Sequence, residues 1–118
     1  MNVAQPLVQA SLLGEAIDHG PALVLVADEE MRYLAVNQKA CDVLGYTREE
    51  LLTVKVADVA PDGELARLRA APTVAGTARV RRKDGTELAL EFRATRTTVA
   101  GMQLFVTVGF VVDARAAS

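Results

Sequence analysis

The N-terminal part of the chain carries the apolar spacing of a helix. Val8, Leu12 and Ala16 recur every fourth residue, which places them on one face of a helix over residues 6–18. A proline suits the first helical turn, and Gly20–Pro21 ends the helix. The pattern therefore predicts an amphipathic helix ahead of the rest of the fold.

Two short strands are predicted next. Residues 22–27 form an unbroken apolar run that is too short for a helix. We interpret this run as a strand buried on both faces. An acidic turn at residues 28–30 then leads into a second strand over residues 32–36.

Short helices with recognisable ends follow the second strand. Asn37 is placed to cap the free amides of a helix over residues 38–44, and Gly45 suits its left-handed end. Thr47 and Glu50 have the spacing of a capping box, which opens another helix. The further helical segments that we expect are residues 48–52, 56–59 and 62–71.

The C-terminal part of the chain alternates apolar and polar residues, which predicts a β-meander. A three-residue loop at residues 83–85 pairs Val80 with Leu88 and Arg81 with Glu87, so that apolar residues share one face. The glycine of this loop then adopts the left-handed conformation of a type I turn with a bulge. The first hairpin is predicted on this basis.

The same rule, applied to residues 99–101, predicts a second three-residue loop. It pairs Phe92 with Val108 and Ala94 with Val106, so that these four residues face the core. The outward-facing residues of the last strand would then include Phe105 and Val111. Together these elements predict an α+β fold: a five-stranded antiparallel sheet, short helices on one face, and an N-terminal amphipathic helix.

Composition places the chain among single globular domains. It has 118 residues, of which 51% are hydrophobic and 24% charged, so intrinsic disorder is excluded. The net charge of −2 argues against a nucleic-acid partner held by phosphate neutralisation. No apolar run approaches the length of a membrane span, and no signal peptide is visible. We therefore expect a cytoplasmic protein.

Candidate chemistry is sparse. The single cysteine, Cys41, excludes a disulfide framework, and the single histidine, His19, excludes most histidine-based metal sites. No nucleophile–base pair, metal-ligand cluster or phosphate-binding loop is present. We expect no catalytic residue and no metal, and hence no enzyme. Cys41 is interpreted as a small buried apolar side chain, and His19 as a favourable residue at a helix C-terminus.

Five segments in order carry a resemblance to a known family. Residues 22–28, 32–37 and 44–52 resemble the first half of a PAS domain. Residues 82–85 look like the PAS hairpin, and residues 109–113 resemble the end of its last strand. The resemblance implies a bacterial sensory or regulatory module that binds a small molecule between sheet and helices and often dimerises. It also implies that Asp113 begins the link to an output domain.

The resemblance divides the chain into a helix at residues 1–20, a PAS domain at residues 21–113 and a tail at residues 114–118. The sequence departs from the family where Met31 stands in place of a glycine, so that either the turn differs or Met31 is strained. The segment over residues 61–76 is also shorter than usual. Cys41 lacks the flavin-adduct motif, and residues 62–71 contain no haem ligand. We therefore expect neither haem nor a photoactive flavin, and the cofactor is unknown.

Two functional surfaces follow from these expectations. The first is a pocket for a small, mostly apolar ligand. Its candidate lining residues are Leu25, Val36, Asn37, Leu44, Leu51, Leu90, Phe92, Val106 and Val108. Asn37 has two interpretations, as a helix cap or as an amide that faces the pocket.

The second surface is a homodimer interface. Its candidate residues are Val8, Leu12, Leu13, Ala16, Phe105 and Val111. The alternative function is a ligand-free protein–protein interaction domain of a histidine kinase or transcription regulator.

Overall fold

The computed structural model describes residues 5–61, 63, 67 and 70–113. The helices are α1 (Pro6–Asp18), α2 (Gln38–Leu44), α3 (Arg48–Leu51) and α4 (Val56–Val59). The strands are β1 (Leu23–Ala27), β2 (Tyr33–Val36), β3 (Thr73–Arg81), β4 (Glu87–Val99) and β5 (Met102–Asp113). The helix expected over residues 62–71 lies mostly outside the described residues.

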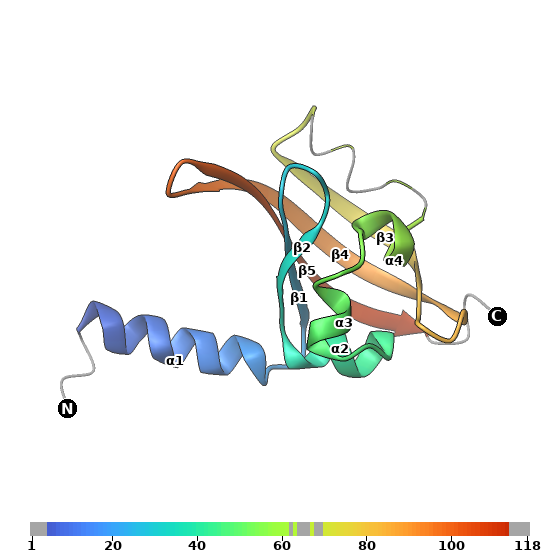
Figure 1. Ribbon diagram of the computed structural model, residues 1–118, viewed down its shortest axis with the longest axis horizontal. Coiled ribbons are helices and arrows are strands. Elements are labelled where there is room, and N and C mark those ends of the chain that lie inside the picture. Colours follow the sequence, from blue (N-terminus) through green and yellow to red (C-terminus); the bar gives the residue numbers. More distant parts are fainter. Residues whose placement is uncertain (1–4, 62, 64–66, 68–69, 114–118) are drawn as a thin grey trace.

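The strands form one sheet in the order β2-β1-β5-β4-β3, with antiparallel neighbours. Figure 1 shows α2, α3 and α4 on one face of this sheet, whereas α1 projects away from the body of the domain. The core lies between the sheet and the three short helices. The predicted fold class is therefore confirmed.

Local capping signals fix the helix ends as predicted. The Asn37 side chain accepts a hydrogen bond from the Ala40 amide, and Gly45 ends α2 with φ of +80°. Thr47 and Glu50 form a reciprocal capping box at the start of α3. These signals act within three residues of the chain, so they do not depend on the tertiary fold.

One expectation about β1 is wrong. Leu23, Leu25 and Ala27 are buried, but Val24 and Val26 between them are only half-buried. The strand is therefore covered fully on its core face alone. The reason is that the described short helices cover only one face of the antiparallel sheet, so alternate residues of β1 have different surroundings.

The first hairpin has the predicted register. Val80 lies opposite Leu88 and Arg81 opposite Glu87, and the loop glycine, Gly85, has φ of +88°. The Arg81 guanidinium lies 3.5 Å from the Glu87 carboxylate across the two strands. Face-matching and turn chemistry agree here, and the prediction is confirmed.

The second hairpin differs from the prediction by one residue. Its loop contains only Ala100 and Gly101, with φ of +51° and +80°, and Val99 pairs with Met102. Positive φ at both loop residues is the type I′ arrangement, whose twist matches that of the flanking strands. Because side chains alternate along a strand, the one-residue shift exchanges the two faces of β5.

This shift corrects several residue placements. Phe105 is 2% exposed and faces the core rather than the outside. Val106 and Val108 pair with Thr95 and Arg93 and face the outside rather than the core. β5 is apolar on both faces, so hydrophobic pattern alone does not define its register.

The β1–β2 turn contains a residue with a strained backbone conformation, Met31. Met31 has φ of +62°, and its amide donates to the Asp28 carbonyl at 3.0 Å. The Asp28 side chain also accepts from the Glu30 and Arg32 amides, at 2.9 and 3.0 Å. The strained alternative for Met31 is therefore the correct one.

Candidate functional site

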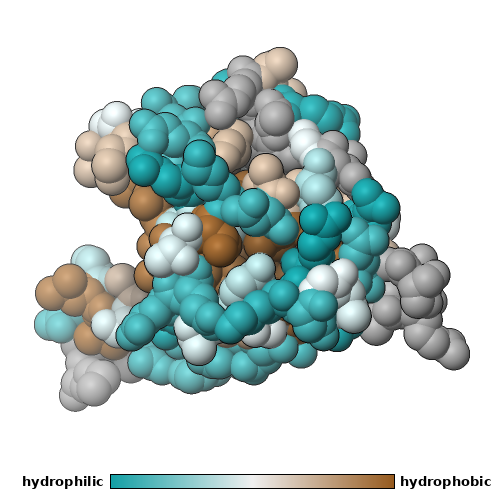
Figure 2. All heavy atoms as spheres, turned by 45° about the vertical axis from the view of Figure 1, so that its right-hand side comes forward, coloured by the Kyte–Doolittle hydropathy of each residue, from teal (hydrophilic) through white to brown (hydrophobic). Residues whose placement is uncertain are grey.

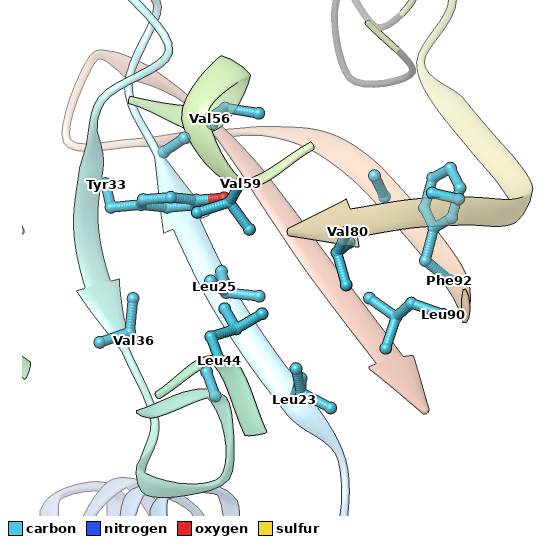
Figure 3. Close-up of a cluster of buried hydrophobic side chains, with 14 of the residues drawn as sticks. Leu23, Leu25, Tyr33, Val36, Leu44, Val56, Val59, Val80, Leu90 and Phe92 are labelled. Carbon is cyan, nitrogen blue, oxygen red and sulfur yellow. The ribbon is translucent and has the colours of Figure 1, made fainter. Parts of the chain in front are cut away.

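An apolar cavity lies between the core face of the sheet and helices α2 and α4. About 30 Å³ of it is open to the centre of a water molecule. All five strands contribute to its wall, and Figure 3 shows several of these side chains converging on one space. The lining residues are Leu23, Leu25, Tyr33, Leu44, Val59, Ala60, Ala78, Val80, Leu90, Phe92 and Thr107.

Chain geometry explains why these residues converge. Alternate residues of β1 point to one face of the sheet, which brings Leu23 and Leu25 into the wall. Leu44 ends α2, and its carbonyl accepts a hydrogen bond from the Lys83 amide at 2.9 Å. That bond ties the end of α2 to the β3–β4 hairpin. In the space-filling view, hydrophobic side chains are visible in a depression surrounded by hydrophilic ones (Figure 2).

The predicted pocket residues divide into three groups. Those that line the cavity are Leu25, Leu44, Leu90 and Phe92. Val36 and Leu51 are buried in the core but do not line the cavity. Val106 and Val108 face the outside, as a consequence of the corrected register of β5.

Asn37 serves as a cap and a junction, and its side-chain amide is fully used outside the cavity. Its Oδ1 atom accepts hydrogen bonds from the Val24 and Ala40 amides, at 2.9 and 3.1 Å. Its Nδ2 atom donates to the Ile17 and Ala22 carbonyls, at 2.7 and 2.8 Å. The single side chain thus joins the end of α1, the residue before β1, β1 itself and the start of α2.

Seven lining residues were not predicted from the sequence: Leu23, Tyr33, Val59, Ala60, Ala78, Val80 and Thr107. Two of them, Ala78 and Val80, could have been predicted, because the register of the first hairpin already placed them opposite core residues of β4. Thr107 was missed because the predicted register turned it outward. No sequence signal distinguishes Val59 and Ala60 from other apolar residues of the short helices.

The cavity wall carries no charged side chain among the described residues. The polar side chains among its described lining residues belong to Tyr33 and Thr107. Burial, with a smaller contribution from nearby Asp58, raises the pKa of Tyr33 well above its usual value. The Tyr33 phenol therefore stays neutral at physiological pH, and so does the whole described wall.

The N-terminal helix presents a second candidate surface. α1 buries none of its residues, and Leu12 and Leu13 are 53% and 61% exposed. Figure 2 shows uncovered hydrophobic side chains at the projecting end of α1. A groove lies where its C-terminal turns meet the outer sheet face, lined by Gly14, Ile17, Asp18, Val24, Val26, Ala35, Val36, Asn37 and Val106.

Some of the residues predicted for the dimer interface lie on this surface, and others do not. Val8, Leu12, Leu13 and Ala16 lie on α1 and are not buried. Phe105 is in the core, and Val111 pairs with the core-facing Leu90 at the end of β5, so neither belongs to the outer face. Val108 and Phe110 are two of the exposed apolar residues that β5 presents there.

The remaining chemical groups fit structural roles. Cys41 is buried, and burial raises the pKa of its thiol, which disfavours the reactive thiolate. His19 is exposed and lies 3.6 Å from Asp18 and 3.7 Å from Glu15. Within the described part of the chain, no group of metal-ligating side chains could hold a metal ion. No described helix is long and apolar enough to cross a membrane.

This architecture is similar to that of known proteins. The sequence model of a family described as PAS fold matches residues 17–102. The structure is similar to a PAS domain from a two-component sensor histidine kinase, with a TM-score of 0.81 and 18% identity over 92% of this chain and 100% of that one.

Two further solved structures are similar. A domain of the sensory box sensor histidine kinase/response regulator from Geobacter sulfurreducens has a TM-score of 0.76 and 22% identity, over 92% of this chain and 99% of that one. The PAS domain of nitrogen regulation protein NR(II) from Vibrio parahaemolyticus has a TM-score of 0.74 and 13% identity, over 86% of this chain and 98% of that one. The comparison with curated proteins gives no significant match.

Proposed function

Because this chain belongs to the PAS-fold family, we propose that it is a non-catalytic sensory module of a signal-transduction protein that binds a small, mostly apolar ligand. The observation that carries this proposal is the apolar cavity between the core face of the sheet and helices α2 and α4. The similarity of this chain to PAS domains of a two-component sensor histidine kinase and of a nitrogen regulation protein supports a signalling context. In this proposal Asp113, the last residue of β5, leads toward an output domain.

The size of the cavity favours a compact ligand. The open volume of about 30 Å³ is close to the share that one water molecule occupies in liquid water. Pockets for drug-sized ligands occupy about 300–1,000 Å³, so the volume supports a small molecule rather than haem or flavin.

A cavity-filling substitution tests this function. Ala78 lies in the wall, whereas Ala75 is exposed on the other face of the same strand. Ala78→Leu should occupy the space that a ligand needs, and Ala75→Leu should leave it open. With toluene as the probe, we expect a rise in melting temperature for the wild type and for Ala75→Leu, and none for Ala78→Leu.

Two results would contradict the proposal. One is the absence of any toluene effect on the wild type, which would favour the alternative of a ligand-free interaction domain. The other is an equal effect on Ala78→Leu, which would place the bound probe outside the cavity. A circular dichroism spectrum of each variant checks that it remains folded.

We further propose that the module dimerises through α1. The supporting observation is that α1 projects from the domain with Leu12 and Leu13 exposed, although its apolar stripe is suited to packing. Light scattering should therefore give the mass of a dimer for the intact chain. Leu12→Glu should shift it to monomer, and Ser11→Glu, an exposed control on the same helix, should not. If the wild type is a monomer at high micromolar concentration, this proposal is contradicted.

A further inference from the structure

The acidic residue that ends α1 stands where local helix chemistry disfavours it. Asp18 is the last residue of α1, and the last turn contains a second acid, Glu15, but no base. The C-terminal end of a helix carries partial negative charge, and aspartate has a low helix propensity. A residue that opposes the local preference in this way points to a role in the tertiary structure.

The Asp18 carboxylate joins α1 to two other helices. Its Oδ1 atom accepts a hydrogen bond from the amide of Gln38, the first residue of α2, at 3.1 Å. The same atom lies 2.6 Å from the guanidinium of Arg48, the first residue of α3. Figure 1 shows the C-terminal end of α1 beside these two helices. The preceding residue, Ile17, adds a third contact, because its carbonyl accepts from the Asn37 side chain at 2.7 Å.

The direction of α1 depends on these polar contacts rather than on core packing. None of the residues of α1 is buried, and Figure 1 shows the helix projecting from the domain. A short connection, residues 19–22, leads from α1 to β1. The side chains of Asp18 and Arg48 are 34% and 45% exposed, so their ion pair is weak and can open without disturbing the core.

We infer that the contacts of Asp18 with Gln38 and Arg48 form a latch that fixes the direction of α1 and so prepares this helix for a second copy of the chain. With the latch closed, α1 has its direction set before association, so less orientational freedom is lost when two copies meet. With the latch open, α1 turns about residues 19–22, and association becomes weaker. The inference rests on the proposed dimerisation through α1 and names the residue that positions its interface.

Nitrogen-15 NMR relaxation of a monomeric variant tests the latch. Leu12→Glu supplies the monomer, because it removes the proposed dimer contact. In this background the α1 amides should have order parameters close to those of the sheet, about 0.85. Addition of Asp18→Ala should lower them below about 0.6 throughout α1. Carbon chemical shifts should show that α1 remains helical, because alanine favours a helix more than aspartate does.

Two further variants assign the effect to the latch. Glu15→Ala removes an acid from the same turn, whose ion pair among the described residues is with His19. It should leave the order parameters of α1 unchanged. Arg48→Gln removes the guanidinium but leaves the hydrogen bond between Asp18 and the Gln38 amide, so it should lower these order parameters by a smaller amount.

The stability of the dimer shows whether the latch affects association. In the chain that retains Leu12, Asp18→Ala should raise the dissociation constant of the dimer about tenfold, because the direction of α1 is no longer set in advance. Glu15→Ala should leave this constant unchanged. Analytical ultracentrifugation measures both values.

The outcomes separate this inference from the proposed dimerisation. If α1 keeps its order parameters in Asp18→Ala, or if Glu15→Ala lowers them equally, Asp18 does not hold α1. If Asp18→Ala loosens α1 but leaves the dissociation constant unchanged, the latch does not prepare α1 for a second copy. Each of these results overturns the inference and leaves dimerisation intact. If the unmodified chain is a monomer, the proposed dimerisation fails together with the role of the latch in it, and the relaxation data still decide whether Asp18 fixes α1.

Discussion

Replacement of Asn37 by alanine should destabilise this domain more than the loss of a helix cap would. The side chain makes four hydrogen bonds, to the Val24 and Ala40 amides and to the Ile17 and Ala22 carbonyls. A hydrogen bond of this kind contributes a net stabilisation of about 1 kcal/mol. Asn37→Ala should therefore lower the free energy of unfolding by about 4 kcal/mol, whereas loss of the cap alone costs about 1 kcal/mol.

Urea unfolding at neutral pH measures this difference. Asn37→Ser retains an oxygen that can cap the Ala40 amide, so it should recover about 1 kcal/mol relative to alanine. Gln38→Ala is the matched control, because the exposed Gln38 side chain makes a single hydrogen bond among the described residues, to Asp42. A loss near 1 kcal/mol for Asn37→Ala, with unchanged m-value, would refute the role of Asn37 as a four-way junction.

Three further substitutions test individual features of the fold. Ala100→Asn should raise stability by about 1 kcal/mol in urea unfolding, because asparagine tolerates the positive φ of the type I′ turn; no gain would contradict the assigned turn. Gly109→Ala should cost about 1–3 kcal/mol, since the added Cβ would lie 2.8 Å from a Leu90 methyl carbon; an unchanged urea midpoint would contradict this close packing. The hydrogen bond from Lys83 lowers the pKa of Glu50. The stabilising effect of this pair is therefore complete above the unfolded pKa of about 4.3, and it is lost as pH falls through the lower folded pKa. Glu50→Gln should therefore flatten the acid side of the stability–pH curve, and an unaltered curve would show that the pair does not contribute.

Local chemistry made the first half of the fold predictable. The helix ends at Asn37, Gly45 and Thr47 depend on side-chain and backbone preferences within a few residues. The first hairpin was also predictable, because Gly85 and the alternation of β3 and β4 favour the same register. The strain at Met31 could be stated only as an alternative, since a turn of different shape would also have explained a non-glycine residue there.

The candidate site was less predictable because it depends on the register of one strand. β5 offers Phe105 on one face and Val106 and Val108 on the other, so apolar pattern supports both assignments. The turn decides between them, and Ala100–Gly101 lacks the asparagine that usually marks a type I′ loop. The cavity residues Tyr33 and Thr107 depend on packing between distant segments, which no local pattern encodes.

Methyl-resolved NMR with toluene shows directly whether a small molecule binds inside the sheet–helix cavity. Leu25, Val80 and Leu90 line the cavity, whereas Val106 and Val108 lie on the outer face and serve as internal controls. If the ligand binds there, we expect saturable shifts of the cavity methyl groups and unchanged signals from the outer-face valines. Unchanged cavity signals, or shifts confined to Val106 and Val108, would contradict it.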